Sequence, residues 1–343
     1  MVNTKLPLGE NISDEKIKLD YNMVQDVPFE NESISYRVLV PKNWNPMTIH
    51  LKSRPVINAE KMTGIGMFVG PQMQNTKPFI LLQVMELHQE MAAADVLRGY
   101  VLANDYKLKT IQEDSPKRVD SLVEFEIEGA TFFGRAMMGI TGNRVGFLLA
   151  AGPYSDYDGL KDTFALASAS FNMTKAPQGD IEPWRECKIG TDWLSFSYPI
   201  SWNFSRPSSF EPNSRAGVEL YHTDIDENII GIIRIKVVLK ANIINIETEL
   251  IKFMDELEEM GVEFGEIMAR DNLSVNGRFI EGHQVVYQAL DKNTGLVREV
   301  WCTLLEDDEY LSFFALLTTR REDAFSIWAV NKRAWQIIMN TLE

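Results

Sequence analysis

Cysteine, histidine and long apolar runs are scarce in this sequence, and each shortage excludes a class of function. Only two cysteines, Cys187 and Cys302, occur in 343 residues, and neither belongs to a C-x-x-C pair. This spacing gives no disulfide framework and no redox motif, so we expect free structural thiols and no catalytic cysteine. The four histidines, which are not spaced with other metal ligands as a zinc motif requires, are His50, His88, His222 and His283. We therefore expect neither a metal nor a cofactor.

The sequence also lacks the segments that carry a protein into or across a membrane. No apolar run approaches the roughly 20 residues of a membrane-spanning helix. Residues 1–28 have neither the basic start nor the apolar core of a signal peptide, and we expect them to form a polar arm. These features favour a cytoplasmic protein, and the periplasm is the alternative if a signal peptide has been removed.

An excess of acidic residues argues against nucleic acid as a partner. The chain has 49 Asp and Glu against 34 Lys and Arg, and its net charge of −15 would repel a phosphate backbone. A protein is therefore the expected partner. The sequence identifies neither that partner nor the oligomeric state.

The length and an internal repeat together predict two domains. A chain of 343 residues exceeds the size at which one hydrophobic core keeps growing. An alternating run, Ile34–Pro41, ends in proline and is followed by Trp44, and the run Trp193–Pro199 is followed by Trp202 in the same way. Both the proline and the tryptophan recur after 158 residues. This fixed period indicates duplication of a whole domain.

Both halves then continue with the same order of elements: two strands, a helix, strands joined by short turns such as Gly142-Asn143 and Asn276-Gly277, and a closing helix. In the first half we expect strands 64–69 and 79–87, helix 91–103, strands 122–127, 131–140 and 144–151, and helix 157–171. In the second half we expect strands 218–222 and 229–239, helix 246–260, strands 263–275, 278–289, 297–305 and 310–317, and helix 322–342.

Strands joined by hairpins predict antiparallel sheets, and the helices between them predict layers packed on those sheets. The expected fold class is α+β, with two tandem α/β/α sandwich domains, each an antiparallel sheet flanked by helices. The expected domains cover residues 29–174 and 188–343. A linker of residues 175–187, rich in proline and glycine at its start, is expected between them.

The pattern resembles the PsbP-like fold, which includes DcrB-type bacterial proteins and the Ran-binding Mog proteins. The resemblance is carried by Tyr36–Pro41 with Trp44, by Phe196–Pro199 with Trp202, and by the run Gly134–Ala151 before a closing helix that ends near Phe171. It implies a binding module, an assembly factor or a secretion-related chaperone. It implies no shared catalytic motif, and fold alone does not settle function.

Three patterns that resemble functional motifs have plainer explanations. The glycines of Gly64–Gly70 precede a proline and a polar turn instead of a helix, which favours closely packed strand glycines or a bulge over a phosphate loop. Asp224–Asn228 lacks the glycine and the last glutamate of a calcium loop, and we expect a hairpin turn there. Alternation places Glu124, Glu126 and Glu128 on one solvated strand face. It also places His222 and His283 at the surface or rim of strands and His88 at a strand end.

With no candidate chemistry, the sequence favours a non-catalytic protein-binding adaptor or accessory factor, for example a component of a bacterial secretion or conjugation machine. Two linked modules engage two sites at once and gain effective concentration. One alternative is a cytoplasmic chaperone for hydrophobic segments of an exported client. The other is an enzyme of unrecognised type, which a deep pocket with convergent titratable groups would favour.

Overall fold

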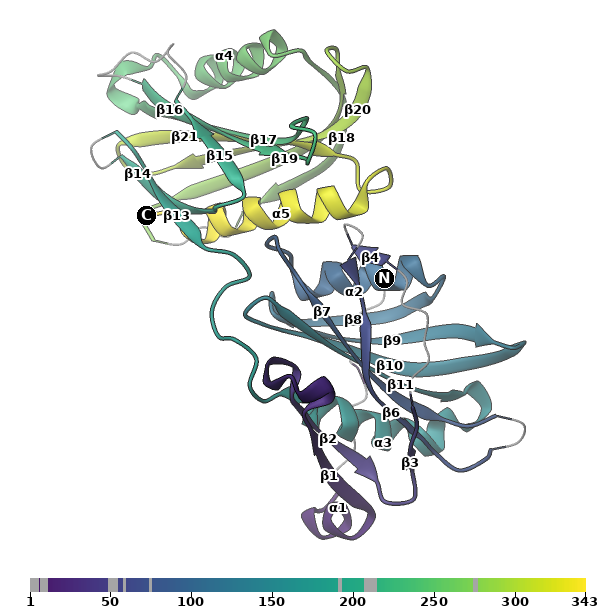
Figure 1. Cartoon of the computed structure of the whole chain (residues 1–343). Helices are drawn as coiled ribbons and strands as arrows, with labels where there is room; N and C mark the ends of the chain where they lie inside the picture. The colour runs from purple at the N-terminus through teal and green to yellow at the C-terminus, as the bar shows by residue number, and fades with distance from the viewer. Residues whose placement is uncertain are drawn as a thin grey trace. The chain divides into compact units, whose positions relative to one another are not determined.

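The computed structural model describes residues 6, 12–48, 55–57, 60–73, 76–190, 193–206, 215–273 and 277–343, without the side chains of 55–57 and 60. The chain divides into two compact units, unit 1 (Met1–Ile181) and unit 2 (Glu182–Glu343). Each unit has its own seven-stranded antiparallel sheet and its own core (Figure 1).

The sheet of unit 1 has the strand order β3-β6-β7-β11-β10-β9-β8. Its strands are β3 (Asn45–Pro46), β6 (Thr63–Val69), β7 (Phe79–Glu86), β8 (Lys107–Ser115), β9 (Arg118–Ile127), β10 (Ala130–Thr141) and β11 (Arg144–Pro153). Gly129 and Gly142 make the turns on either side of β10, with φ of +80° and +56°. This left-handed backbone favours glycine, which is why the chain turns back at these two positions.

Helices cover both faces of the unit 1 sheet. On one face lies α2 (Ala93–Ala103), where the Tyr100 ring stands 4.4 Å from the Phe147 ring of β11, centroid to centroid. The other face is covered by α3 (Tyr157–Ser170) and by a small sheet of order β1-β2-β12, which consists of β1 (Tyr21–Asp26), β2 (Tyr36–Pro41) and β12 (Asn172–Met173). Among the other short elements are α1 (Asp14–Asp20), β4 (Pro55–Ile57), β5 (Glu60–Lys61) and the 3₁₀ turns Pro28–Glu30, Glu32–Ile34 and Tyr154–Asp156.

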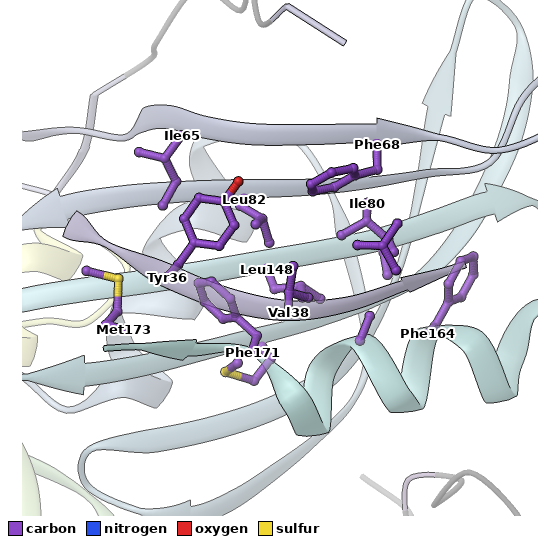
Figure 2. Packing of buried hydrophobic residues seen from close by; sticks show 14 of the residues in the cluster. Tyr36, Val38, Ile65, Phe68, Ile80, Leu82, Leu148, Phe164, Phe171 and Met173 are labelled. Carbon is purple, nitrogen blue, oxygen red and sulfur yellow. The ribbon is translucent and has the colours of Figure 1, made fainter. Parts of the chain in front are cut away.

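The buried cluster between the small sheet, α3 and the large sheet is the main core of unit 1. In Figure 2, Val38 of β2 and Phe164 of α3 lie against Ile80 and Leu148 of the large sheet. All four side chains are essentially inaccessible to water. Burial of such aliphatic and aromatic side chains stabilises the fold by roughly 1.5–3 kcal/mol each.

Unit 2 repeats this arrangement with the strand order β15-β16-β17-β21-β20-β19-β18. Its strands are β15 (Trp202–Ser205), β16 (Arg215–Thr223), β17 (Ile229–Leu239), β18 (Val262–Asn272), β19 (Glu281–Asp291), β20 (Leu296–Glu306) and β21 (Tyr310–Thr319). Helix α4 (Ile246–Glu259) packs on one face, and α5 (Phe325–Asn340) packs on the other with the β13-β14 hairpin (Figure 1). That hairpin consists of β13 (Trp184–Ile189) and β14 (Leu194–Pro199).

The strand orders of the two units correspond position by position, and in both units one helix follows the second long strand and another closes the unit. The predicted fold class, two antiparallel sheets each flanked by helices, is confirmed. Some predicted bounds are also those of the structure: β17 covers residues 229–239, and α2 ends at Ala103. The expected turn at Asn276-Gly277 falls partly outside the described residues, although β18 and β19 pair as antiparallel neighbours.

Two segments differ from what the sequence predicts. The polar arm expected over residues 1–28 contains α1 and the strand β1, which pairs with β2 from Tyr21↔Pro41 to Asp26↔Tyr36. Pairing satisfies the backbone groups along that edge of β2, and this need outweighs the weak apolar pattern of the segment. At the other segment, the end of the linker expected over residues 175–187 belongs to β13, which pairs with β14 for the same reason.

Candidate binding surfaces

Helices α2 and α4 leave one end of their sheet face uncovered. In unit 1 this end is marked by Leu81 of β7, which pairs with Leu149 of β11. Side chains alternate along a strand, so both point away from the α3 side, where their neighbours Ile80 and Leu148 are buried. They lie on the α2 face, where the Tyr100 hydroxyl donates to Gln83 Oε1 at 3.3 Å.

The uncovered end of unit 1 is hollow and mainly apolar. We call it concavity 1, a space of about 700 Å³. Its floor consists of Phe79, Leu81, Phe132 and Leu149, all of which are buried. Aromatic rings dominate one side of it, since the Phe79 and Phe132 rings are 6.0 Å apart. The rim includes Lys77, Tyr106, Ile127 and Glu128.

Unit 2 has a hollow at the corresponding place, concavity 2, with a volume of about 460 Å³. Ile232 of β17 pairs with Leu317 of β21, as Leu81 pairs with Leu149 in unit 1, and both line the space. Val262 and Val300 complete a floor that is aliphatic instead of aromatic. The two concavities therefore share a position in the fold and differ in lining.

In both units the hollow lies just past the end of the covering helix and beside a strand turn. Tyr106 and Val262 are the residues that enter the first strand after α2 and α4, and each lines its concavity. The β9–β10 turn borders concavity 1, and the β19–β20 turn borders concavity 2. The repetition in two copies with diverged sequences shows that the open apolar end is a consistent feature of this chain's domain.

Apolar side chains at both rims are open to solvent. Ile127 at concavity 1 is 38% exposed, while Ile229 and Leu290 at concavity 2 are 47% and 38% exposed. Single exposed apolar residues are common, but several around an apolar hollow are the usual mark of an interaction surface.

Acidic charge is concentrated in unit 2, which carries 27 Asp and Glu against 16 Lys and Arg, compared with 22 against 18 in residues 1–181. Two buried cations of unit 2 are paired: Arg234 bridges Glu219 and Glu256, and Lys236 Nζ lies 2.6 Å from Glu256 Oε1. This network links strands to α4 and has equal numbers of the two charges, so we assign it a structural role.

Two histidines lie where alternation suggests, and one does not. His283 and His88 are exposed, and His88 follows the end of β7. His222 was expected at the surface and is buried, at 2% exposure, because Trp202 and the helix residue Asn331 pack against it. His50 lies outside the described residues.

The glycine run and the acidic turn have the structures that the sequence predicts. β6 contains a bulge between Gly64 and Gly66, and a Cβ on Gly66 would lie 2.6 Å from the Tyr36 hydroxyl. Asp224 Oδ1 accepts the N–H groups of Asp226 and Asn228 at 2.9 and 2.8 Å, which closes the turn between β16 and β17.

Glu124 and Glu126 lie on one face of β9, as the alternation predicts, but Glu128 does not. Glu124 is mostly covered and lies 2.8 Å from Lys109 Nζ and 3.3 Å from Lys107 Nζ. These lysines are the main cause that lowers its pKa. Glu126 is exposed on β9, whereas Glu128 lies in the following turn with φ of +49° because the strand ends at Ile127.

Both cysteines are free and buried. Burial raises the pKa of the Cys302 thiol to about 12 and that of the Cys187 thiol to about 11. Across the described part of the chain, no group of three or more His, Cys, Asp or Glu side chains is arranged to hold a metal ion. No helix in that part has the length and apolar character needed to span a bilayer.

No protein-family model matches the chain, and no curated protein matches it. Several solved structures do. The PsbP protein of the cyanobacterium Synechocystis is 12% identical, with a TM-score of 0.34, and the match covers 45% of this chain and 92% of that protein. The Ran-binding protein Mog1p of Saccharomyces cerevisiae is 11% identical, with a TM-score of 0.31, and covers 47% of this chain and 95% of its own.

A third match extends over both units. The immunity protein TplEi of T6SS from Pseudomonas aeruginosa is 9% identical, with a TM-score of 0.25, and the match covers 94% of this chain and 96% of that one. The similarity to PsbP and Mog proteins that the sequence suggests is thus also found among solved structures, and it concerns the fold alone.

Proposed function

We propose that this chain is a non-catalytic binding protein, and that concavities 1 and 2 each hold an apolar part of a protein partner. The observation that carries this proposal is that both units repeat one open, apolar sheet end. The cross-strand pair Leu81–Leu149 marks this end in unit 1, and the pair Ile232–Leu317 marks it in unit 2.

The physical case rests on the cost of exposing apolar surface. Burial of an apolar side chain contributes roughly 25 cal/mol per Å² removed from water. A partner that covers rim side chains such as Ile127 or Leu290 therefore gains binding free energy from them. Two sites on one chain also raise the effective concentration of the second site once the first is filled. An aromatic floor in concavity 1 and an aliphatic floor in concavity 2 favour two different anchor side chains.

Within this proposal, the finer role is that of an adaptor or accessory factor of a bacterial secretion or conjugation machine, which holds a folded protein of that machine. The alternative is a chaperone that holds hydrophobic segments of an unfolded client. The two roles differ in the state of the partner, which is folded in the first and unfolded in the second.

Capture experiments with matched variants test the binding role. A tagged chain is used to capture partners from its own organism, alongside the double variant Ile127→Asp, Leu290→Asp. A control double variant, Leu102→Asp with Ile251→Asp, places the same charges on exposed apolar positions of α2 and α4 that line neither concavity.

We expect one partner to be retained by the wild type and by the control and lost by the concavity variant. Titration of that purified partner then gives the loss of affinity, which we expect to be at least tenfold per concavity for a buried anchor. Equal retention by both variants would show that the concavities do not bind. A partner that binds only after unfolding would favour the chaperone.

A further inference from the structure

The rim of concavity 2 carries acidic and aliphatic side chains on one turn. This turn, Asp224–Asn228, joins β16 to β17, and Glu227 and Asn228 line the concavity. Ile225 in the same turn is 97% exposed, and Ile229, which follows the turn, also lines the concavity. A partner that covers this rim therefore meets apolar surface and carboxylates together.

The three carboxylates of the turn form no ion pair with any described residue. Asp224 Oδ1 accepts the N–H groups that close the turn. Asp226 and Glu227 are exposed, and no described lysine or arginine nitrogen lies within 4.0 Å of any of the three carboxylates. Their negative charge is therefore open to a cation brought by a partner.

Other charged side chains at concavity 2 are paired with one another. Arg298 lines the concavity, and its Nη2 lies 3.6 Å from Asp291 Oδ2. The next residue after Asp291 is Lys292, whose Nζ lies 3.4 Å from Glu263 Oε2. These two pairs balance each other's charges, so they leave the excess of the turn unchanged.

The two arginines that follow β21 at this end of the sheet are also engaged. Arg320 Nε lies 2.7 Å from Asp323 Oδ2. The Arg321 guanidinium lies over the Trp328 ring of α5, 5.3 Å from its centroid, and α5 packs on the opposite face of the sheet. The charge beside concavity 2 is therefore set by the Asp224–Asn228 turn.

The charge and the floor of concavity 2 together define the segment that fits it. Its floor is aliphatic, with Ile232, Val262 and Leu317 among the lining residues. The rim of concavity 1 differs in charge, because it includes one cation and one anion, Lys77 and Glu128. Carboxylates attract a cation within roughly 8 Å, the screening length at physiological ionic strength. Concavity 2 thus fits aliphatic side chains that have positive charges close to them.

We propose that the partner segment held by concavity 2 is basic: its aliphatic side chains lie on the floor, and neighbouring lysine or arginine side chains lie at the Asp224–Asn228 turn. This inference rests on the proposed function and adds the chemistry of the segment that unit 2 binds. The overall charge of unit 2, with 27 acidic residues against 16 basic ones, acts in the same direction by steering a cationic segment toward the site.

Four capped hexapeptides test the proposal on the full chain. Three have two central leucines flanked on each side by two lysines, two serines or two glutamates, and the fourth has two central glycines flanked by lysines. Binding is followed by NMR of the isoleucine δ1-methyl groups, in which the Ile232 signal is the one that disappears in Ile232→Val.

We expect the lysine–leucine peptide to shift the Ile232 signal along a saturable curve, with about tenfold higher affinity than the serine peptide in about 50 mM NaCl. This preference should shrink to about twofold in about 0.5 M NaCl, because salt screens the rim charges. The glutamate peptide should bind more weakly than the serine peptide. The lysine–glycine peptide should leave the Ile232 signal in place, because it has no side chain for the floor.

Matched charge variants locate the effect at the rim. Asp226→Asn with Glu227→Gln removes two carboxylates and keeps Asp224, which closes the turn. Asp271→Asn with Asp308→Asn removes two exposed carboxylates at the opposite end of the sheet. We expect the rim variant to lose about fivefold in affinity for the lysine–leucine peptide and to keep its affinity for the serine peptide. The control variant should change neither affinity by more than about twofold.

Other results would overturn the proposal in distinguishable ways. Equal affinity for the lysine–leucine and serine peptides would remove the basic segment and leave the apolar role of concavity 2 intact. Equal losses in the two charge variants would assign the effect to the overall charge of unit 2 instead of the turn. A shift of the Ile232 signal by the lysine–glycine peptide would show that the floor does not select aliphatic side chains. No shift from any leucine peptide would overturn both this inference and the proposed function of concavity 2.

Discussion

The imidazole of His222 stacks on the indole of Trp202, with the ring centroids 5.2 Å apart and the planes at 27°. Its Nδ1 lies 2.6 Å from Asn331 Oδ1. The amide of Asn331 donates to the Ile230 carbonyl and to Thr318 Oγ1, so its oxygen is left to accept from the imidazole. The histidine, on β16, thus links the edge strand β15 to α5.

This contact predicts a loss of stability in acid. Burial lowers the pKa of His222 below its ordinary 6.5, against the opposing effects of Asn331 and Asp224. Below that ordinary value the unfolded chain binds a proton that the folded chain does not, so the free energy of unfolding falls as the pH falls. We expect His222→Gln, which keeps a donor and has no such proton, to lose less stability between about pH 7.5 and about pH 5. Urea denaturation of both proteins at several pH values measures the difference, and parallel curves would contradict the assignment.

A glycine of β10 lies where the backbone of the neighbouring strand β11 comes very close. A Cβ on Gly134 would lie 2.6 Å from Ala151 Cβ and would also collide with the Ala150 carbonyl oxygen of the neighbouring strand. Gly134→Ala should therefore lower the free energy of unfolding by about 1–3 kcal/mol, as overpacked cores do. Gly139→Ala on the same strand is the matched control, because its nearest neighbour is Met137 Sδ at 4.0 Å. Chemical denaturation of the pair tests the contact, and equal stabilities would refute it.

The sequence predicts the central strands well and misses several of the edge strands. β17 and β11 are long apolar runs bounded by turn residues, so the apolar run and its flanking turns both predict a strand there. β8 was not predicted, because its sequence KLKTIQEDS is mainly charged and polar. Such a composition suits an edge strand, where charge prevents pairing with other chains, and it hides the strand from a hydrophobicity pattern. β1 and β13 were missed for a similar reason.

The candidate sites could not be predicted from local patterns. Concavity 1 joins Phe79 of β7, Tyr106 just before β8 and Phe132 of β10, which meet only through the sheet register. His222 shows the limit of alternation, since the pattern places it on one face of β16 and says nothing of whether Trp202 and α5 cover that face.

The buried thiols predict a chain that is inert to thiol reagents while folded. Burial raises the pKa of Cys302 to about 12 and that of Cys187 to about 11, which leaves almost no thiolate near neutral pH. We expect Ellman's reagent to report no rapidly reacting thiol in the native protein and both thiols after denaturation in guanidinium. Rapid reaction of a thiol in the native protein would show that Cys187 or Cys302 is accessible.

A buried ion pair fixes β9 to β10 in unit 1. The Asp120 carboxylate accepts from Arg135 Nε and Nη2 at 2.9 and 2.7 Å and from Ser168 Oγ of α3 at 2.9 Å. Removal of one charge leaves the other buried without its partner, so Asp120→Asn should lower the free energy of unfolding by about 3–5 kcal/mol. The exposed pair of Lys117 and Asp180 supplies the control, because Asp180→Asn should change it by less than about 1 kcal/mol.

A double variant separates the cost of the unpaired Arg135 charge from the cost of the lost hydrogen bond to Ser168. If the cost in Asp120→Asn comes from an uncompensated arginine, then Asp120→Leu combined with Arg135→Met should be more stable than Asp120→Asn, since it removes both charges and keeps apolar volume. If the cost comes instead from the hydrogen bond to Ser168, the double variant should be no more stable, because it loses that bond as well. Denaturation curves for the wild type, Asp120→Leu, Arg135→Met and the double variant form a thermodynamic cycle that gives the coupling energy of the ion pair, and comparison with Asp120→Asn shows whether the charge or the Ser168 hydrogen bond dominates.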